Sequence, residues 1–229
     1  MRERFNKIIA TYDRALAEHG VTPAGILWPN AADLATRFEV LLGPWLPESG
    51  VGARPLRLLD LGCGPGFLLD FLQQNGLRSH VKYTGVDINA AMIDIARARH
   101  PSDRFMLRDV TEAPFEANHF DVAIMCGVLT VRFGNTYAEM ETFAKETLSA
   151  VWSGVQRGLA FNVMSKHVDW ERDDLFHWPL DEIMKFCKAE LSRHVSIRLD
   201  YGLWEAGVFV SREPASTRAV APAAWFSRP

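Results

Sequence analysis

A strand that leads straight into a glycine-rich turn is the feature of this sequence that most constrains its fold. The stretch LLDLGCGPGFLLDFL, residues 58–72, places Gly62, Gly64 and Gly66 between two apolar runs. Glycines in such a turn let a ligand approach the backbone without obstruction by Cβ atoms, and the turn opens at the positive end of a helix. The stretch therefore predicts a buried strand, a ligand-binding turn and a helix in direct succession.

Short apolar runs alternate with amphipathic segments from residue 55 onward. This alternation is typical of strand–helix units around a buried parallel sheet. The residues from 196 to 213 indicate two further strands joined by a glycine-centred turn. The expected fold is doubly wound α/β, with a mostly parallel seven-stranded sheet that ends in an antiparallel hairpin. The other strands are predicted at 56–61, 81–86, 103–107, 120–126 and 158–163, and helices at 66–75, 89–98, 135–156 and 179–193.

Two helices are expected before the first strand. Apolar residues recur at helical spacing over 2–19, and again after Asn30, whose side chain suits a helix cap. Prolines and small residues are frequent at the other end of the chain, which is typical of a loose tail. We therefore divide the chain into an N-terminal helical lid (1–50), a principal domain (51–212) and a C-terminal tail (213–229).

The composition excludes several classes of protein. Hydrophobic residues make up 48% of the 229 residues, and the formal net charge of −3 comes without a basic run that would favour nucleic acid. The longest apolar run, 122–131, is too short to cross a bilayer, and the charged start MRERFNKII lacks the apolar segment of a signal peptide. The three cysteines show no metal-ligand spacing. We expect a cytoplasmic protein with no membrane or nucleic-acid partner and no metal site.

Three acidic residues accompany the turn, each near the carboxyl end of a predicted strand. Asp60 lies two residues before the first glycine, where a carboxylate would repel a pyrophosphate and hold a cationic amine. Asp87 ends the strand VKYTGV, from where a carboxylate accepts hydrogen bonds from ribose hydroxyls, and Asp109 follows the next strand. The spacing GxGxG also departs from the GxGxxG of dinucleotide sites. These features indicate a cationic nucleoside as the ligand.

The motifs resemble those of the class I S-adenosylmethionine-dependent methyltransferases. LLDLGCGPGF, YTGVDIN, RDV and HFDVAIMCGVL match the family's first four motifs, and the likeness covers about residues 55–212. It implies S-adenosylmethionine as the cofactor, with Asp60 at its methionine part, Asp87 at its ribose and Asp109 at its adenine amino group. The cofactor contacts implied in this way are Asp60, Gly62, Cys63, Gly64, Gly66, Asp87, Ile88, Asp109, Val110 and Cys126.

The methyl acceptor is expected to contact the segments that reach the same edge of the sheet. His167 is the first candidate for a general base, because it follows the fifth strand and an imidazole titrates near neutral pH; a solvated loop residue is the alternative. Candidates for substrate binding are Tyr12, Trp28, Arg37, Arg132, Tyr201 and Glu205, and Asp169 and Trp204 lie in the same segments.

Several of these candidates have a second interpretation. Arg37 and Arg132 either clamp an acidic acceptor or pair with a nearby acid. Glu205 either binds the acceptor or forms a salt bridge with Arg198. The tryptophans of the predicted rim segments either face a flat acceptor or pack in the core; they are Trp28, Trp170, Trp178 and Trp204.

The expected activity is methyl transfer by direct displacement to an oxygen or nitrogen of a small molecule, with oxygen favoured, in bacterial secondary or sugar metabolism. The fourth strand continues as CGVLTVRFGN, and not as the Asn/Asp-Pro-Pro-Tyr/Phe segment of family members that act on nucleobase and glutamine nitrogens. A protein or RNA methyltransferase, a cofactor-binding protein without transfer activity and a nicotinamide-dependent reductase remain as alternatives. The sequence leaves the oligomeric state open, with a homodimer as one option.

Overall fold

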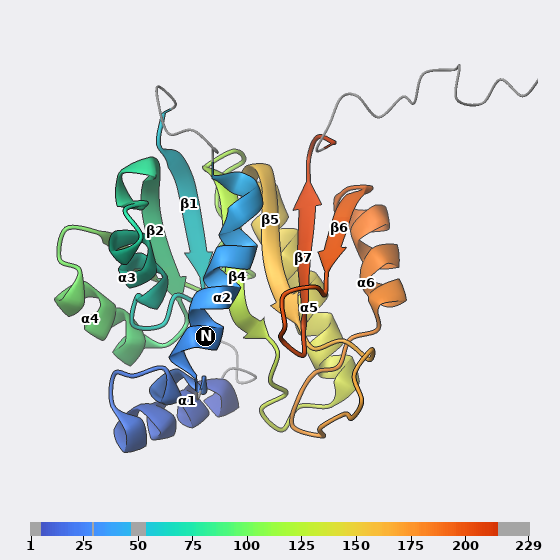
Figure 1. Ribbon diagram of the computed structural model, residues 1–229, viewed down its shortest axis with the longest axis horizontal. Coiled ribbons are helices and arrows are strands. Elements are labelled where there is room, and N and C mark those ends of the chain that lie inside the picture. The colour runs from blue at the N-terminus through green and yellow to red at the C-terminus, as the bar shows by residue number, and fades with distance from the viewer. Residues whose placement is uncertain (1–5, 29, 47–53, 215–229) are drawn as a thin grey trace, which may run out of the picture.

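The computed structural model describes residues 6–28, 30–46 and 54–214, and these build one seven-stranded sheet flanked by helices (Figure 1). The order of strands across the sheet is β3-β2-β1-β4-β5-β7-β6. The start of the predicted lid and nearly all of the predicted tail lie outside the described residues. The strands are β1 (Leu56–Leu61), β2 (Val81–Asp87), β3 (Arg104–Leu107), β4 (Phe120–Leu129), β5 (Val155–Val163), β6 (His194–Arg198) and β7 (Ala206–Ser211).

The first five strands pair in parallel, and β7 inserts antiparallel between β5 and β6. This confirms the predicted doubly wound sheet with its terminal hairpin. Because the parallel strands all point the same way, their carboxyl ends form one edge, which lies at the bottom of Figure 1. In open α/β sheets, ligands bind at this edge.

Helices cover both faces of the sheet. The core on one face joins α2 (Ala31–Leu42), α3 (Phe67–Gln74) and α4 (Ala90–Arg99) to Leu58 and Val122, whereas α5 (Tyr137–Gly154) and α6 (Leu180–Phe186) pack on the other face with Leu59 and Ala123. Adjacent strand residues face opposite layers, so both are apolar. A π-helical turn, Cys187–Leu191, follows α6, and short 3₁₀ turns occur at Ala24–Ile26, Gly43–Trp45 and Arg78–His80.

The two N-terminal helices occupy different places. The first, α1 (Asn6–His19), lies beyond the carboxyl ends of β1 and β2 (Figure 1), and the Asn89 side chain after β2 donates a 2.7 Å hydrogen bond to Asp13. The second, α2, packs on the face of the sheet and begins at Asn30, whose Oδ1 accepts a 2.9 Å hydrogen bond from the N–H of Ala32. The predicted cap is therefore confirmed, and α1 is the helix next to the ligand-binding edge.

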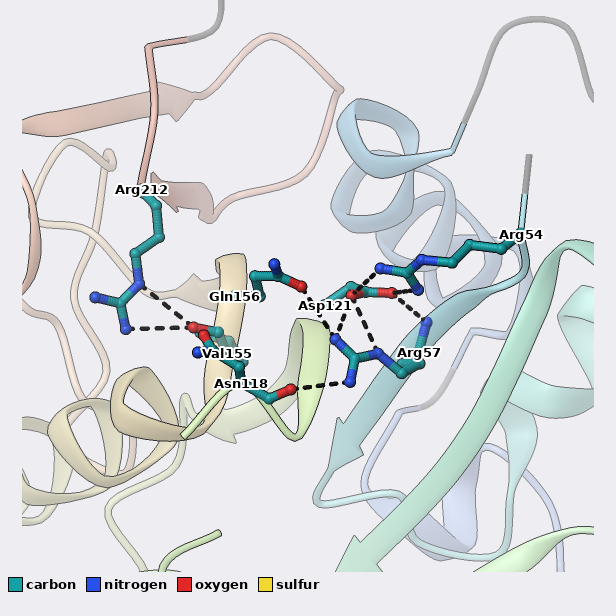
Figure 2. A network of polar contacts seen from close by, with 7 residues as sticks. All are labelled: Arg54, Arg57, Asn118, Asp121, Val155, Gln156 and Arg212. Carbon is teal, nitrogen blue, oxygen red and sulfur yellow. Dashed lines mark hydrogen bonds and ion pairs between the residues drawn. The ribbon is translucent and has the colours of Figure 1, made fainter. Parts of the chain in front are cut away.

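A charged cluster closes the opposite edge of the sheet (Figure 2). Asp121, the second residue of β4, has a side chain that is 1% exposed, and it accepts hydrogen bonds from the guanidinium of Arg54 at 2.6 and 2.8 Å and from Arg57 Nη2 at 2.7 Å. Burial opposes ionisation, but the two arginines outweigh it and hold the pKa of Asp121 well below its usual range. Nearby, Arg212 donates to the carbonyl of Val155 (Figure 2), so β1, β4, β5 and the end of β7 are tied together at this edge.

Within the described residues, no helix combines the length and the apolar character that a membrane span requires.

Candidate active site

The glycine turn leaves space for a ligand, and its backbone N–H groups already donate to acceptors within the protein. Gly62, Gly64 and Gly66 have φ values of 75°, 51° and 88°, a region that side chains with a Cβ rarely adopt. The N–H groups of Gly62 and Cys63 donate to the carbonyl of Val86 at 2.8 and 3.1 Å, and that of Gly66 donates to Cys63 at 3.0 Å. The N–H of Gly64 donates to the Asp87 carboxylate at 2.9 Å. The turn therefore has no free row of donors for a pyrophosphate.

Asp60 is a buried carboxyl group at the end of β1. The hydroxyl of Tyr83, on the neighbouring strand, donates to it at 2.6 Å. Burial and the nearby charge of Asp87 raise the pKa of Asp60 to about 7, against the opposing effect of the Tyr83 hydrogen bond. A cationic ligand group would favour the ionised form, so the position suits an ammonium or sulfonium.

Asp87 and Asp109 complete the acidic edge. Asp87 accepts the N–H groups of Gly64 and Asn89, both at 2.9 Å, which fix its orientation, and burial raises its pKa. The Oδ1 of Asp109 accepts from Thr111, whereas its Oδ2 is buried without a hydrogen-bond partner in the described part of the chain. A buried acceptor of this kind calls for a donor from a ligand.

A cavity lies over Asp60 and Asp87, beneath α1. It encloses about 860 Å³ when the space at its open mouth is included. Seven of the predicted cofactor residues line it: Asp60, Gly62, Cys63, Gly64, Asp87, Ile88 and Cys126. Gly66, Asp109 and Val110 do not line it; a Cβ at Gly66 would lie 2.9 Å from the ring of His100, so packing requires this glycine. The cavity is also lined by residues of α1, α3 and α4 that were not predicted: Ile8, Ile9, Phe67, Asn89 and Met92.

A wider groove adjoins this cavity. The two share Tyr12, Ile26, Trp28 and Phe133 in their walls. The far wall of the groove includes Trp170 and Trp204, which are 49% and 56% exposed. Aromatic side chains therefore line the passage from the cavity into the groove, as in sites that bind flat organic molecules.

A buried polar network forms the floor of the groove. Arg37 Nε donates to both carboxylate oxygens of Glu205, at 3.1 and 2.9 Å, and Asn162 Nδ2 donates to the same carboxylate at 3.0 Å. The Oδ1 of Asn162 accepts the N–H of Gly127, in the cavity wall, at 2.7 Å. The network thus joins the groove to the cavity. Asn162 was missed, although a lone amide within the apolar strand 158–163 has to find buried partners.

This network corrects one prediction. Glu205 does not form a salt bridge with Arg198, which pairs with Asp200 on the surface. The partner of Glu205 is Arg37, which is 168 residues away in the sequence and reaches it because α2 packs across β5 and β7. Tyr201 also approaches Glu205, with its hydroxyl 3.4 Å from Oε1.

Other candidates lie away from the cavity and the groove. His167 and Asp169 are exposed and line neither. Arg132 donates to the carbonyls of Asn135 and Asp173 and so holds two loops together. The interpretation of Trp178 as a rim residue is wrong, since it is fully buried in the core between Phe176 and Phe186.

The described residues contain no group of three or more His, Cys, Asp or Glu side chains that could hold a metal ion. Near the passage, Tyr12 has an elevated pKa because of burial and the charge of Asp87, so its hydroxyl stays protonated. The arrangement can bind a cationic nucleoside in the cavity and place a second molecule beside it in the groove.

Comparisons with known proteins identify the family. Residues 58–153 match a family model described as a methyltransferase domain. A putative methyltransferase of Mycobacterium tuberculosis is 30% identical over 162 residues, which cover 70% of this chain and 95% of the relative. The malonyl-[acyl-carrier protein] O-methyltransferase of Serratia marcescens is 25% identical over 163 residues, covering 69% of this chain and 62% of the relative. The solved structure of magnesium protoporphyrin IX methyltransferase from Synechocystis with bound S-adenosylmethionine aligns with a TM-score of 0.57 at 17% identity, covering 93% of this chain and 95% of that one. This chain belongs to the class I S-adenosylmethionine-dependent methyltransferases.

Proposed function

We propose that this methyltransferase transfers the methyl group of S-adenosylmethionine to a small organic acceptor bound in the groove, at an oxygen in preference to a nitrogen. The observation that carries the proposal is the shared wall of Tyr12, Ile26, Trp28 and Phe133 between the cavity and the groove. Two ligands in these spaces would lie side by side, which is what a direct displacement requires.

The residues of the cavity suit the cofactor. Asp60 would hold its ammonium group, and Asp87, fixed by Gly64 and Asn89, would accept the ribose hydroxyls. The buried Oδ2 of Asp109, which lies outside the cavity lining, is the acceptor that we propose for the adenine amino group. The occupied N–H groups of the turn also favour this cofactor over a dinucleotide.

The methyl group arrives already activated on the sulfonium, so the protein has mainly to align the acceptor and exclude water. Ile8, Ile9 and Phe133 provide apolar walls next to the acidic positions. His167 lines neither space, so we do not assign it the role of a base. The name of the Serratia relative, an O-methyltransferase, supports oxygen as the accepting atom.

The test uses the full chain with cofactor that carries an isotope-labelled methyl group, incubated separately with small-molecule, protein and RNA fractions of a bacterial extract. We expect label in the small-molecule fraction together with S-adenosylhomocysteine. Label confined to protein or RNA would contradict the proposal. Cofactor binding without any transfer would also contradict it and would identify a cofactor-binding protein without transfer activity. The control is Asp87→Asn, expected to weaken cofactor affinity by about 1–3 kcal/mol, or roughly 5- to 150-fold, through lost charge-assisted hydrogen bonds.

A further inference from the structure

Arg37 is held in place from two sides. Its Nε donates to both oxygens of Glu205 at 3.1 and 2.9 Å, and its Cζ lies 3.8 Å from the centre of the Trp28 ring. Only 9% of its side chain is exposed. A guanidinium stacked on an aromatic ring and paired through Nε is fixed in orientation before any ligand binds.

The outer end of the same guanidinium is free. Its two Nη atoms make no hydrogen bond to the residues that the structure describes, and Arg37 lines the groove. Two parallel N–H groups at this end match the two oxygens of a carboxylate. The partner on the protein side, Glu205, is already satisfied by Arg37 Nε and Asn162, so it does not need the Nη donors.

The other charged side chains of the groove are engaged elsewhere. Arg172 pairs with Asp174, and Asp33 accepts a 3.1 Å hydrogen bond from the Asn30 side chain at the start of α2. His19 lies 3.8 Å from Glu18. Among the described groove residues, Arg37 is therefore the arginine whose two Nη groups both remain for a ligand.

The position of Arg37 relates it to the cofactor cavity through Trp28. This ring lines both the cavity and the groove, and a Cβ at Gly127, in the cavity wall, would lie only 2.9 Å from it. A carboxylate on Arg37 would therefore leave the rest of its molecule along Trp28 and Phe133, at the entrance to the cavity.

We propose that the methyl acceptor is a flat organic acid whose carboxylate binds to the Nη groups of Arg37. The proposal rests on the proposed function, because it names the acceptor of that same groove. The carboxylate serves as the anchor, or is itself the accepting group, and in both cases an acceptor without it binds more weakly.

The test measures binding by calorimetry to the full chain saturated with S-adenosylhomocysteine. The probes are matched pairs with the same ring: benzoate and benzamide, and naphthalene-2-carboxylate and its amide. We expect at least one carboxylate to bind about tenfold or more tightly than its amide. If no carboxylate in the panel binds more tightly than its amide, the proposal is wrong. A carboxylate preference without methyl transfer would contradict the proposed function and leave the anion site standing.

Variants separate Arg37 from a general charge effect. Arg37→Gln alone leaves Glu205 buried without its cation and is expected to fold poorly, so the Arg37→Gln/Glu205→Gln double variant replaces the ion pair by two neutral amides. The double variant should lose the carboxylate preference and keep S-adenosylhomocysteine affinity within about twofold. Glu205→Gln alone, which leaves the guanidinium, should keep or increase the preference. The matched control Arg198→Gln removes an exposed arginine and should behave as the wild type. A preference that survives in the double variant would overturn the proposal.

Discussion

At the scale of single residues, Asp60 has the most consequential environment. It is buried at the end of β1, next to Asp87 and under the hydroxyl of Tyr83. These surroundings raise its pKa to about 7, so without a ligand it changes its charge within the physiological pH range. A carboxyl group of this kind links the binding of a cation to the release of a proton.

The first prediction concerns this linkage. Below pH 7 Asp60 of the free protein is mostly neutral, and on the proposal that it holds the cofactor's ammonium group, binding requires its ionisation. We therefore expect cofactor affinity to fall as the pH drops through about 7, by at most about tenfold per pH unit, and to level off above it. Calorimetric titration with S-adenosylhomocysteine from pH 5.5 to 8.5 measures this profile.

Tyr83→Phe is the matched variant for the profile. It removes the hydrogen bond that favours the ionised carboxylate, so the midpoint should move to higher pH with little change in shape. An affinity that is flat across neutral pH in the wild type would show that Asp60 does not hold the ammonium group.

The site residues that could be predicted are those with a recognisable motif in their own stretch of sequence. Asp60 and Asp87 each stand next to a recognisable strand end, and the parallel sheet brings such ends together. Tyr83 and Asn162, in contrast, lie within apolar strands, and the sequence does not say which buried acid they meet. Their roles depend on which strands pair with each other, and the partners of such a pair are far apart in the sequence.

At the scale of elements, α5 has a complete start signal. The Thr136 side chain accepts the N–H of Glu139 at 3.3 Å, and Glu139 Oε2 in turn accepts the N–H of Thr136 at 2.7 Å. This capping box satisfies two donors that a helix start otherwise leaves without partners. The helix packs its buried face on β4 and β5, and Phe143 from this face lines the cavity.

The second prediction tests this cap. Thr136→Ala should lower the free energy of unfolding by about 1 kcal/mol and leave cofactor affinity unchanged, since the cap lies outside the cavity. Urea denaturation followed by circular dichroism measures the change. Thr142→Ala, in the interior of the same helix, is the control and should be neutral or slightly stabilising, because alanine has the higher helix propensity. Equal losses in the two variants would argue against the cap.

The predicted elements were found, but some bounds moved for structural reasons. β4 continues to Leu129, three residues past the predicted end, through irregular pairing with β5 and through Gly127 at a φ of 82°. In the sequence, a glycine within an apolar run indicates a break in the strand, so the predicted strand ended before it. The predicted helix 179–193 consists of α6 and a π-helical turn that follows it. The apolar periodicity of the sequence does not distinguish such a turn from an α-helix.

At the scale of the whole molecule, the buried acidic residues at the two ends of the strands have different partners. At the ligand-binding edge the buried acids Asp60 and Asp87 have hydroxyl and backbone N–H partners, whereas at the other edge the buried Asp121 is paired with Arg54 and Arg57. The second arrangement joins β1 to β4 at the centre of the sheet. We therefore attribute a stabilising role to the edge that contains Asp121, and ligand binding to the opposite edge.

The third prediction follows from the paired edge. Asp121→Asn should destabilise the fold by about 1–3 kcal/mol at pH 7, because the hydrogen bonds to two guanidinium groups lose their charge. The pKa of Asp121 is lowered in the folded state, so its contribution is present above about pH 4 and is lost as the pH falls further. The difference between wild type and variant in urea denaturation should therefore shrink between pH 5 and pH 3. Asp200→Asn, in an exposed pair, is the control and should change stability little.

Contacts between distant parts of the chain were the least predictable. The sequence placed Arg37 and Glu205 in the same region, but it offered Arg198 as the partner because that residue is nearby in the sequence. The true pair depends on how α2 lies across β5 and β7, a tertiary relation. Trp178 was misplaced for the same reason, since its burial depends on α6.

The division of the ligand-binding edge has a consequence for engineering. The donor half is built from β1 and β2 with their turns, while the acceptor half draws on α2 and the residues before β7. On the proposal that the groove holds the acceptor, exchanging residues 37 and 205 together would retarget the enzyme to new acceptors while the methyl donor is retained. Asn162 limits such redesign, because its amide bonds to Glu205 on the groove side and to the N–H of Gly127 on the cavity side.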